Sequence, residues 1–174
     1  MSKKEEITSV IETILNQEVD EEKLQKRREN LGYFLIEAIE EDDIQCQELA
    51  ILLGADVTVD DNYSIQIASE NGHTKLVKAL IAAGADVKAN NNYPINTALK
   101  KDHKEVVKLL VENGADISRE LTDAVENGQK EIVEFLIECG ANVTVDDNRL
   151  LKCAFSHGHK EVVELLISAG ASFS

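Results

Sequence analysis

Hydrophobic and polar positions form a block that recurs five times along the chain, and the blocks align on a Gly near the end of each. These glycines are separated by 30, 30, 26 and 30 residues, at Gly54, Gly84, Gly114, Gly140 and Gly170. An Ala stands sixteen residues before every one, at Ala38, Ala68, Ala98, Ala124 and Ala154. A Leu or Ile stands nineteen residues before, at Leu35, Ile65, Ile95, Leu121 and Leu151. A position that is always Ala predicts close contact between helices, and the recurrence predicts a stack of repeated units.

Two helices are predicted in each block. The second helix carries two apolar pairs at helical spacing, such as Leu76-Val77 and Leu80-Ile81, which lie on one helical face. A polar break such as Asn71-Gly72-His73 precedes this helix, and Gly84 follows it where a C-cap is expected. Each unit is therefore predicted to be a helix, a tight turn, a second helix and a loop, and the fold class is all-α.

These residues resemble the ankyrin repeat, whose pattern of T-P-L-H-x-A, then G-H, an apolar helix and G-A-D is approximated from about residue 33 to residue 174. The resemblance implies an ankyrin-repeat solenoid that binds partner proteins through its concave surface. The leading tetrapeptide departs from the family pattern, as in Tyr63-Ser64-Ile65-Gln66, and the period of 30 residues is shorter than the family's ~33. We therefore expect a shortened hairpin loop. The Asn-Tyr opening and the 30-residue period look most like the ankyrin arrays encoded by giant DNA viruses, and this resemblance implies a viral protein.

The chain is expected to form one continuous domain, with an N-terminal helical extension at residues 1–32 and five repeats at residues 33–174. Ile7, Val10, Ile11, Ile14 and Leu15 fall on one helical face and copy the paired spacing of the second helices. We interpret residues 1–20 as a degenerate half-repeat that caps the stack. The charged segment after it is either a short helix or an early start of the next one.

The loop before repeat four is shorter than the others. Nine residues separate Gly114 from Ala124, where thirteen separate the corresponding residues of the other repeats. Four loop residues are missing, and we expect a notch at this point of the loop edge.

The charge of the chain limits its partners. The net charge is −15, which argues against a nucleic-acid partner, because phosphates would be repelled. Residues 1–56 hold 15 acidic and 6 basic residues, so the negative charge is concentrated at this end. Neither the apolar core of a signal peptide nor a membrane-spanning run is present, the longest apolar run being Leu49 to Leu53. We expect no membrane association and a cytoplasmic location, with the nucleus left open.

The residues that could carry chemistry are better explained by structure, so we expect no enzyme activity, no catalytic residues, no cofactor and no metal site. Cys46, Cys139 and Cys153 show no metal-ligand spacing and are interpreted as reduced thiols that pack as small apolar groups. His73, His103 and His159 occupy one turn position in separate repeats, where inter-repeat hydrogen bonding is expected. No Cys or carboxylate is judged to be spaced to complete a site with His157 and His159. The pairs Asp60-Asp61 and Asp146-Asp147 are interpreted as solvated turn residues rather than calcium loops or acid–base dyads.

The variable positions of the repeats are the loop tips and the exposed ends of the first helices. By the resemblance, these positions form the partner-binding surface of a non-enzymatic interaction protein, acting as an adaptor or an inhibitor of another protein. They are Asp61, Asn62, Glu70, Asn71, Asn91, Asn92, Lys100, Lys101, Glu126, Asn127, Asp147, Asn148, Ser156 and His157.

Two further expectations concern partners. The alternative function is an acidic mimic that inhibits a nucleic-acid-binding protein through the N-terminal end of the chain. The last helix keeps the apolar residues of an internal repeat, so self-association through an uncapped C-terminal repeat is also expected.

Overall fold

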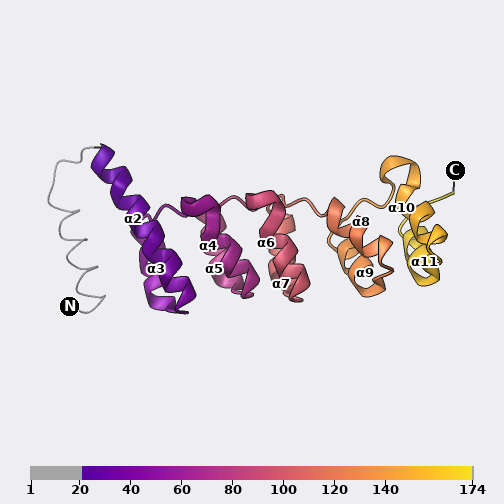
Figure 1. The fold of residues 1–174 in the computed structure, drawn as a ribbon, viewed down its shortest axis with the longest axis horizontal. Coiled ribbons are helices and arrows are strands. Elements are labelled where there is room, and N and C mark those ends of the chain that lie inside the picture. The colour runs from indigo at the N-terminus through magenta and orange to yellow at the C-terminus, as the bar shows by residue number, and fades with distance from the viewer. Residues whose placement is uncertain (1–20, 174) are drawn as a thin grey trace.

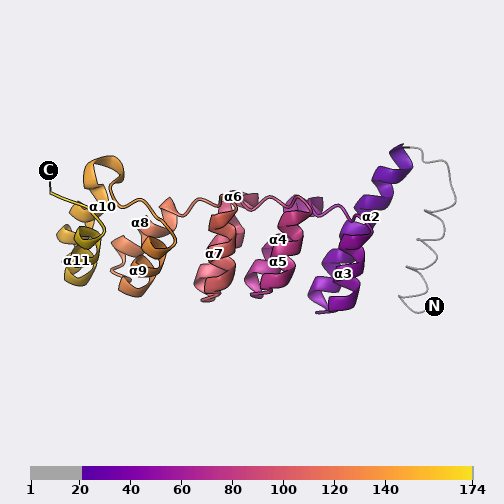
Figure 2. The same ribbon diagram turned by 180° about the vertical axis from the view of Figure 1, so that it is seen from behind.

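The structure, a computed structural model, describes residues 21–173, and for residues 145–147 it describes the backbone alone. This part of the chain contains helices and no strands, and it forms five helix–turn–helix units in a single row, with the first and the last unit at opposite ends of the row (Figures 1 and 2). The helices pair in chain order as α2 (Glu21–Glu40) with α3 (Ile44–Leu52), α4 (Val59–Glu70) with α5 (Thr74–Ala82), α6 (Ala89–Lys100) with α7 (Lys104–Glu112), α8 (Ser118–Glu126) with α9 (Lys130–Glu138), and α10 (Val145–Ser156) with α11 (Lys160–Ser168). The predicted all-α solenoid is confirmed.

The core of the row is built from the positions that define the repeat. The Leu or Ile of each first helix is at most 1% exposed, and the Ala three residues later is at most 2% exposed. These residues join one continuous hydrophobic cluster with the paired apolar residues of the second helices, such as Val77, Leu80 and Leu110. Each unit buries its apolar face against its neighbours, as expected for a solenoid.

Residues that accept left-handed backbone conformations shape the loops. Asp60, Asp61 and Asn62 have φ of 52°, 54° and 62°, and form a left-handed turn at the start of α4. Asn90, Asn91 and Asn92 do the same at the start of α6. Asp and Asn tolerate this region better than other residues with a Cβ, because their short polar side chains form local hydrogen bonds. The Asp-Asp-Asn and Asn-Asn-Asn triplets are thus the signal for this turn.

The four residues missing from repeat four are those of this turn. After Ile117 the chain enters α8 directly at Ser118, without the left-handed residues that stand at the start of α4 and α6. The adjoining helices α6 and α8 also meet less extensively than α2 with α4, α4 with α6 or α8 with α10. The joint between repeats three and four is therefore the loosest in the described part of the chain.

The structure decides one point about the N-terminal region that the sequence left open. The charged segment after Asp20 is an early start of the first repeat, because α2 runs without interruption from Glu21 to Glu40 and across the expected boundary at residue 32. The proposed capping half-repeat at residues 1–20 lies outside the described residues.

Candidate protein-binding surface

The expected partner-binding residues lie along the loop edge and at the C-terminal ends of the first helices. Exposed residues among them are Asp61, Asn71, Asn91, Lys100, Lys101, Glu126, Asn127, Ser156 and His157, while Asn62, Glu70, Asn92 and Asn148 are half-buried. Asp147 lies in α10, and its side chain is outside the described part. We call the surface formed by the loops and first helices the inner surface, and the one formed by the second helices the outer surface.

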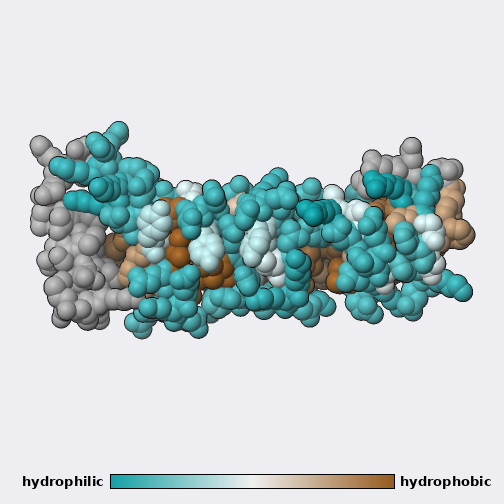
Figure 3. Space-filling model, viewed as in Figure 1, coloured by the Kyte–Doolittle hydropathy of each residue, from teal (hydrophilic) through white to brown (hydrophobic). Residues whose placement is uncertain are grey.

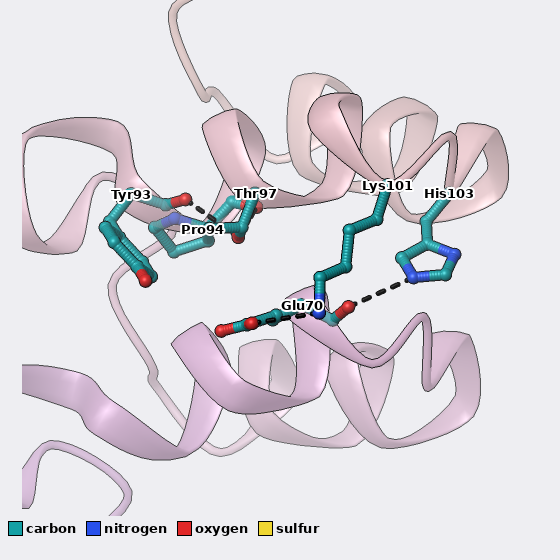
Figure 4. Close-up of polar contacts among 6 residues, drawn as sticks. All are labelled: Glu70, Tyr93, Pro94, Thr97, Lys101 and His103. Atoms are coloured by element: carbon teal, nitrogen blue, oxygen red, sulfur yellow. Dashed lines mark hydrogen bonds and ion pairs between the residues drawn. The ribbon is translucent and has the colours of Figure 1, made fainter.

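Lys101 and Glu70 join neighbouring repeats across the inner surface. The Lys101 ammonium lies 2.9 Å from the Glu70 carboxylate, and both side chains remain partly exposed (Figure 4). An exposed pair of this kind contributes little to stability, about 0–1 kcal/mol. It does hold two of the expected binding residues in a fixed relation, with Lys100 exposed beside them.

The sequence predicts inter-repeat hydrogen bonds for all three turn histidines, and two of them form such bonds. His103 Nε2 is 3.0 Å from the backbone oxygen of Glu70 (Figure 4), and His159 Nε2 is 3.0 Å from that of Glu126. Each ring lies over the turn glycine of the preceding repeat, so that a Cβ on Gly72 or Gly128 would come within 2.6 Å of the ring. His73 instead faces the Asp42 carboxylate at 3.7 Å. These imidazoles have structural roles.

The turn of repeat three differs from those of repeats two and four. It has Asp102 in place of the glycine, also at a positive φ of 59°. The residue that follows at the histidine position of repeat four is Gln129. A side chain is thus accommodated at this turn in repeat three, as it is at Asp42 in repeat one, where His73 faces the carboxylate.

Asparagines of the loops hold neighbouring loops in register. Asn62 Oδ1 accepts a hydrogen bond of 2.8 Å from the amide of Asp86, and Asn148 Oδ1 accepts one of 3.3 Å from the amide of Ser172. The side-chain oxygen of the equivalent Asn92, which stands before the shortened loop of repeat four, is buried and has no hydrogen-bond partner among the described residues. These side chains contribute to loop geometry besides any role in binding.

Acidic residues after the repeat glycines close the loops. Asp56 Oδ1 accepts hydrogen bonds from the Thr58 hydroxyl at 2.6 Å and from its amide at 2.9 Å, and these bonds lower the pKa of Asp56. Asp116 makes the same bonds with Ser118, with the same lowering of its pKa. The loop carboxylates therefore stabilise turns.

Cys153 meets His157 in a contact that the sequence analysis did not predict. Cys153 stands one helical turn earlier in α10, and its Sγ lies 3.6 Å from His157 Nδ1. The same nitrogen lies closer, at 2.9 Å, to the backbone oxygen of Cys153, to which it donates if it is protonated. Burial raises the pKa of the Cys153 thiol, so it is not an activated nucleophile. Within the described residues, no three His, Cys, Asp or Glu side chains form a group that could hold a metal ion.

A row of exposed tyrosines and arginines was missed by the sequence analysis. Tyr33, Tyr63, Tyr93, Arg119 and Arg149 each stand 21 residues before the Gly of their repeat, so alignment on the glycines would have revealed them. All five are exposed, and we call them the Tyr–Arg row. Figure 4 shows Tyr93 at the start of α6 and Lys101 just beyond its end, both on the side toward α4. The row therefore adjoins the expected binding residues.

The outer surface carries a groove of about 710 Å³ between α3 and α5. Its walls include Ile44, Ile51, Leu52, Leu76 and Ala79, with Asp42, Glu48 and Lys75 at the polar positions. Hydrophobic surface is visible between the first repeats in the space-filling view (Figure 3). This hollow lies away from the residues expected to bind a partner.

Comparison with known proteins agrees with this architecture. The family described as ankyrin repeats (3 copies) matches residues 35–120 and 121–174, which is most of the chain. The chain belongs to the ankyrin-repeat family. A comparison with curated protein sequences finds no match. Among solved structures, the ankyrin-repeat domain of Bcl-3, described as a unique member of the IkappaB protein family, is similar with a TM-score of 0.64 and 26% identity over 79% of this chain and 70% of that one.

Membership of the ankyrin-repeat family establishes the general class of function. Ankyrin repeats are generally protein–protein interaction modules and a non-enzymatic fold, in which the surface of each protein determines what it binds. No helix in residues 21–173 is both long and apolar enough to cross a membrane.

Proposed function

We propose that this ankyrin-repeat protein is a non-enzymatic adaptor or inhibitor that binds a partner protein through its inner surface. The observation that supports this most is that the core positions are nearly identical in all repeats, while the exposed ends of the first helices differ. Lys100 in repeat three, Glu126 in repeat four and Ser156 in repeat five occupy equivalent exposed positions with different charge. Variation of this kind on a constant scaffold is what selectivity for a partner requires.

The proposal is tested by charge reversal on the two surfaces. The full chain is immobilised, and the proteins that it captures from a lysate are identified. The affinity for the main partner is then measured for Lys100→Glu. The control is Lys78→Glu with Lys160→Glu on the outer surface. Lys101 is left unchanged because of its 2.9 Å ion pair with Glu70, and Lys130 because its Nζ lies 3.4 Å from Glu161.

We expect Lys100→Glu to weaken binding by about tenfold and the outer pair to leave it unchanged, because a few central residues of an interface carry most of its energy. Thermal unfolding checks that all variants are folded. An outer pair that weakens binding while Lys100→Glu does not would place the site on the outer surface and contradict the proposal.

The acidic mimic is kept as a second candidate because of one observation. Glu37, Glu40, Glu41 and Asp42 are all exposed at the end of α2 and in the turn that follows. A mimic would lose its partner when Glu40 and Asp42 are replaced by Gln and Asn, and its binding would fall steeply with salt. Binding that depends on Lys100 and not on these carboxylates favours the adaptor or inhibitor.

Four narrower proposals accompany this function. The 30-residue period and the Asn-Tyr openings support a viral source, through their resemblance to the arrays of giant DNA viruses. The net charge of −15 supports a partner other than nucleic acid, and apolar runs no longer than Leu49 to Leu53 support a cytoplasmic location without membrane association. Exposed aromatic side chains in repeat five support self-association.

A further inference from the structure

The Tyr–Arg row presents an unusual set of side chains on one line of the inner surface. It contains every tyrosine of the chain. The three tyrosines Tyr33, Tyr63 and Tyr93 are 59%, 37% and 39% exposed, and Arg119 and Arg149 continue the line on α8 and α10. Tyr and Arg are the residue types most enriched where binding energy concentrates, and Tyr loses little conformational entropy on binding.

The spacing of the tyrosines selects an extended ligand. The helices α2, α4 and α6 pack side by side, and packed helices lie ~8–10 Å apart, so an aromatic ring recurs at about that interval. A polyproline II helix has three residues per turn and rises about 9.3 Å in each turn. Every third residue of such a segment would therefore meet one tyrosine, in the manner by which proline-rich peptides dock on aromatic surfaces.

The surroundings of the row disfavour an α-helical ligand. An amphipathic helix needs an apolar groove for its apolar face. On the helices that carry the tyrosines, the inner surface instead presents polar side chains that are exposed or half-buried, such as Glu37, Glu70 and Thr97, with Lys101 just beyond the end of α6. A polyproline II segment has a solvated backbone and buries little more than its prolines, so it suits rings separated by polar side chains.

The arginines specify the second part of the ligand. Among the described residues, the one ion pair of Arg119 is a long contact within its own helix, with Nε 3.9 Å from Asp123 Oδ2, and both side chains are exposed. Guanidinium groups favour carboxylates, with which they form paired hydrogen bonds. Because α6 and α8 meet less closely than the other first helices, the regular interval is interrupted between Tyr93 and Arg119. The ligand therefore needs a spacer between its prolines and its carboxylates.

We propose that the Tyr–Arg row binds a proline-rich protein segment in the polyproline II conformation, with a proline at every third residue over the tyrosines and, after a spacer, two carboxylates that meet Arg119 and Arg149. This inference rests on the proposed function, because it names the chemistry of the partner that the inner surface binds.

The test uses a fluorescent peptide as the probe and the full chain as the receptor. The peptide has three prolines at every third position, a Gly-Ser spacer and two aspartates at every third position, and its affinity is measured by fluorescence anisotropy. Receptor variants are Tyr63→Ala with Tyr93→Ala, Tyr63→Phe with Tyr93→Phe, and Arg119→Gln with Arg149→Gln. The matched control is Lys78→Gln with Lys160→Gln on the outer surface, and thermal unfolding confirms that each variant is folded.

We expect the alanine pair to weaken peptide binding by about tenfold or more, while the phenylalanine pair, which keeps the rings, and the outer pair bind as the unchanged protein does. Replacing the two aspartates of the peptide by asparagine is expected to weaken binding as much as the arginine variant. The asparagine peptide is expected to bind the arginine variant no more weakly than it binds the unchanged protein. Such a result assigns the carboxylates of the peptide to the two arginines.

Several results would overturn the inference. They are binding no tighter than that of a scrambled peptide, equal affinity for the alanine pair, or a bound peptide whose circular dichroism becomes helical. If Lys100→Glu still weakens capture of a partner protein in those cases, the proposed function stands and only the ligand chemistry is wrong. If neither peptide nor partner binding depends on the inner surface, both proposals fail.

Discussion

Glu120 shows how one residue can conflict with the fold that contains it. It stands in α8 at a position where the other repeats have Phe34, Ser64, Pro94 or Leu150. Its side chain is 8% exposed, and neither carboxylate oxygen has a hydrogen-bond partner in the described part of the chain. Burial, with a smaller contribution from the charge of Asp116, raises the pKa of Glu120. The ionised form is therefore destabilising in the folded state.

This conflict gives a pH-dependent prediction. Because the pKa of Glu120 is higher in the folded than in the unfolded chain, its ionisation destabilises the fold above the folded-state pKa, and the penalty disappears as the pH falls to the unfolded-state pKa. Glu120→Gln is expected to raise the free energy of unfolding by about 1 kcal/mol at neutral pH, with the gain vanishing at acidic pH. Urea unfolding across this range measures it.

Glu126→Gln at the exposed end of the same helix is the control for Glu120→Gln, and we expect it to show no such pH-dependent gain. An equal stabilisation by Glu120→Gln at all pH values would contradict an ionisation origin. The lowered pKa of Asp116 acts in the opposite direction, because its stabilising contribution is lost as the pH falls. Comparing each variant with the unchanged protein removes this shared background.

At the scale of the element, the turns between paired helices contact the next helical pair and hold it in place. Gly128 and Gly158 have similar φ values, 66° and 74°, in equivalent turns. A Cβ on Gly128 would lie 2.5 Å from the ring nitrogen of His159, whereas a Cβ on Gly158 would meet nothing within 4 Å. The two positions share the same backbone demand and differ in the inter-repeat contact.

Replacing each glycine by Ala therefore separates the two effects. Both changes incur the strain of a left-handed Ala, about 1–2 kcal/mol. We expect Gly128→Ala to destabilise by roughly 0.5–1.5 kcal/mol more, because the displaced His159 ring loses its hydrogen bond with the Glu126 carbonyl. Denaturant midpoints measure both. If the two variants lose the same free energy of unfolding, the contact between His159 and Gly128 does not stabilise the packing of repeats four and five.

At the scale of the whole molecule, the end face of repeat five carries exposed apolar side chains. In the other repeats, the equivalent face packs against the next repeat. Phe155, Ile167 and Phe173 are 68%, 48% and 56% exposed, and the two Phe rings meet edge to face with centroids 5.5 Å apart. Hydrophobic surface is visible at this end of the molecule in Figure 3. Contiguous exposed apolar surface of this kind is characteristic of interaction sites.

We expect this end to associate with a second copy of the chain. Light scattering over a range of concentrations should show a rising average mass, and Phe155→Glu with Ile167→Glu should restore the monomer while leaving peptide and partner binding by the inner surface intact. Because Ile44→Glu with Leu52→Glu in the groove between α3 and α5 alters an equally apolar but distant site, it serves as the control. A strictly monomeric protein at all concentrations would remove this proposal.

The sequence by itself determined the repeat, the class of fold and the identity of the core. Leu35 and its four equivalents had to be buried, because only helices stacked at a fixed period place them on a shared face. The same reasoning predicted the positive-φ glycines after the second helices and the loss of loop residues before Ala124. These results depend on local backbone preferences and on the period of apolar residues, and both can be read from the sequence alone.

Only the tertiary structure decided what lies next to what across repeats. Several contacts depend on the angle and distance between stacked units. Examples are the ring of His103 over Gly72, the ion pair of Lys101 with Glu70 and the small contact between α6 and α8. The start of α2 at Glu21 is likewise known only from the structure. The period of a repeat fixes the face on which a side chain lies, whereas its partners are fixed by how closely neighbouring helices pack, and this closeness is a property of the whole stack.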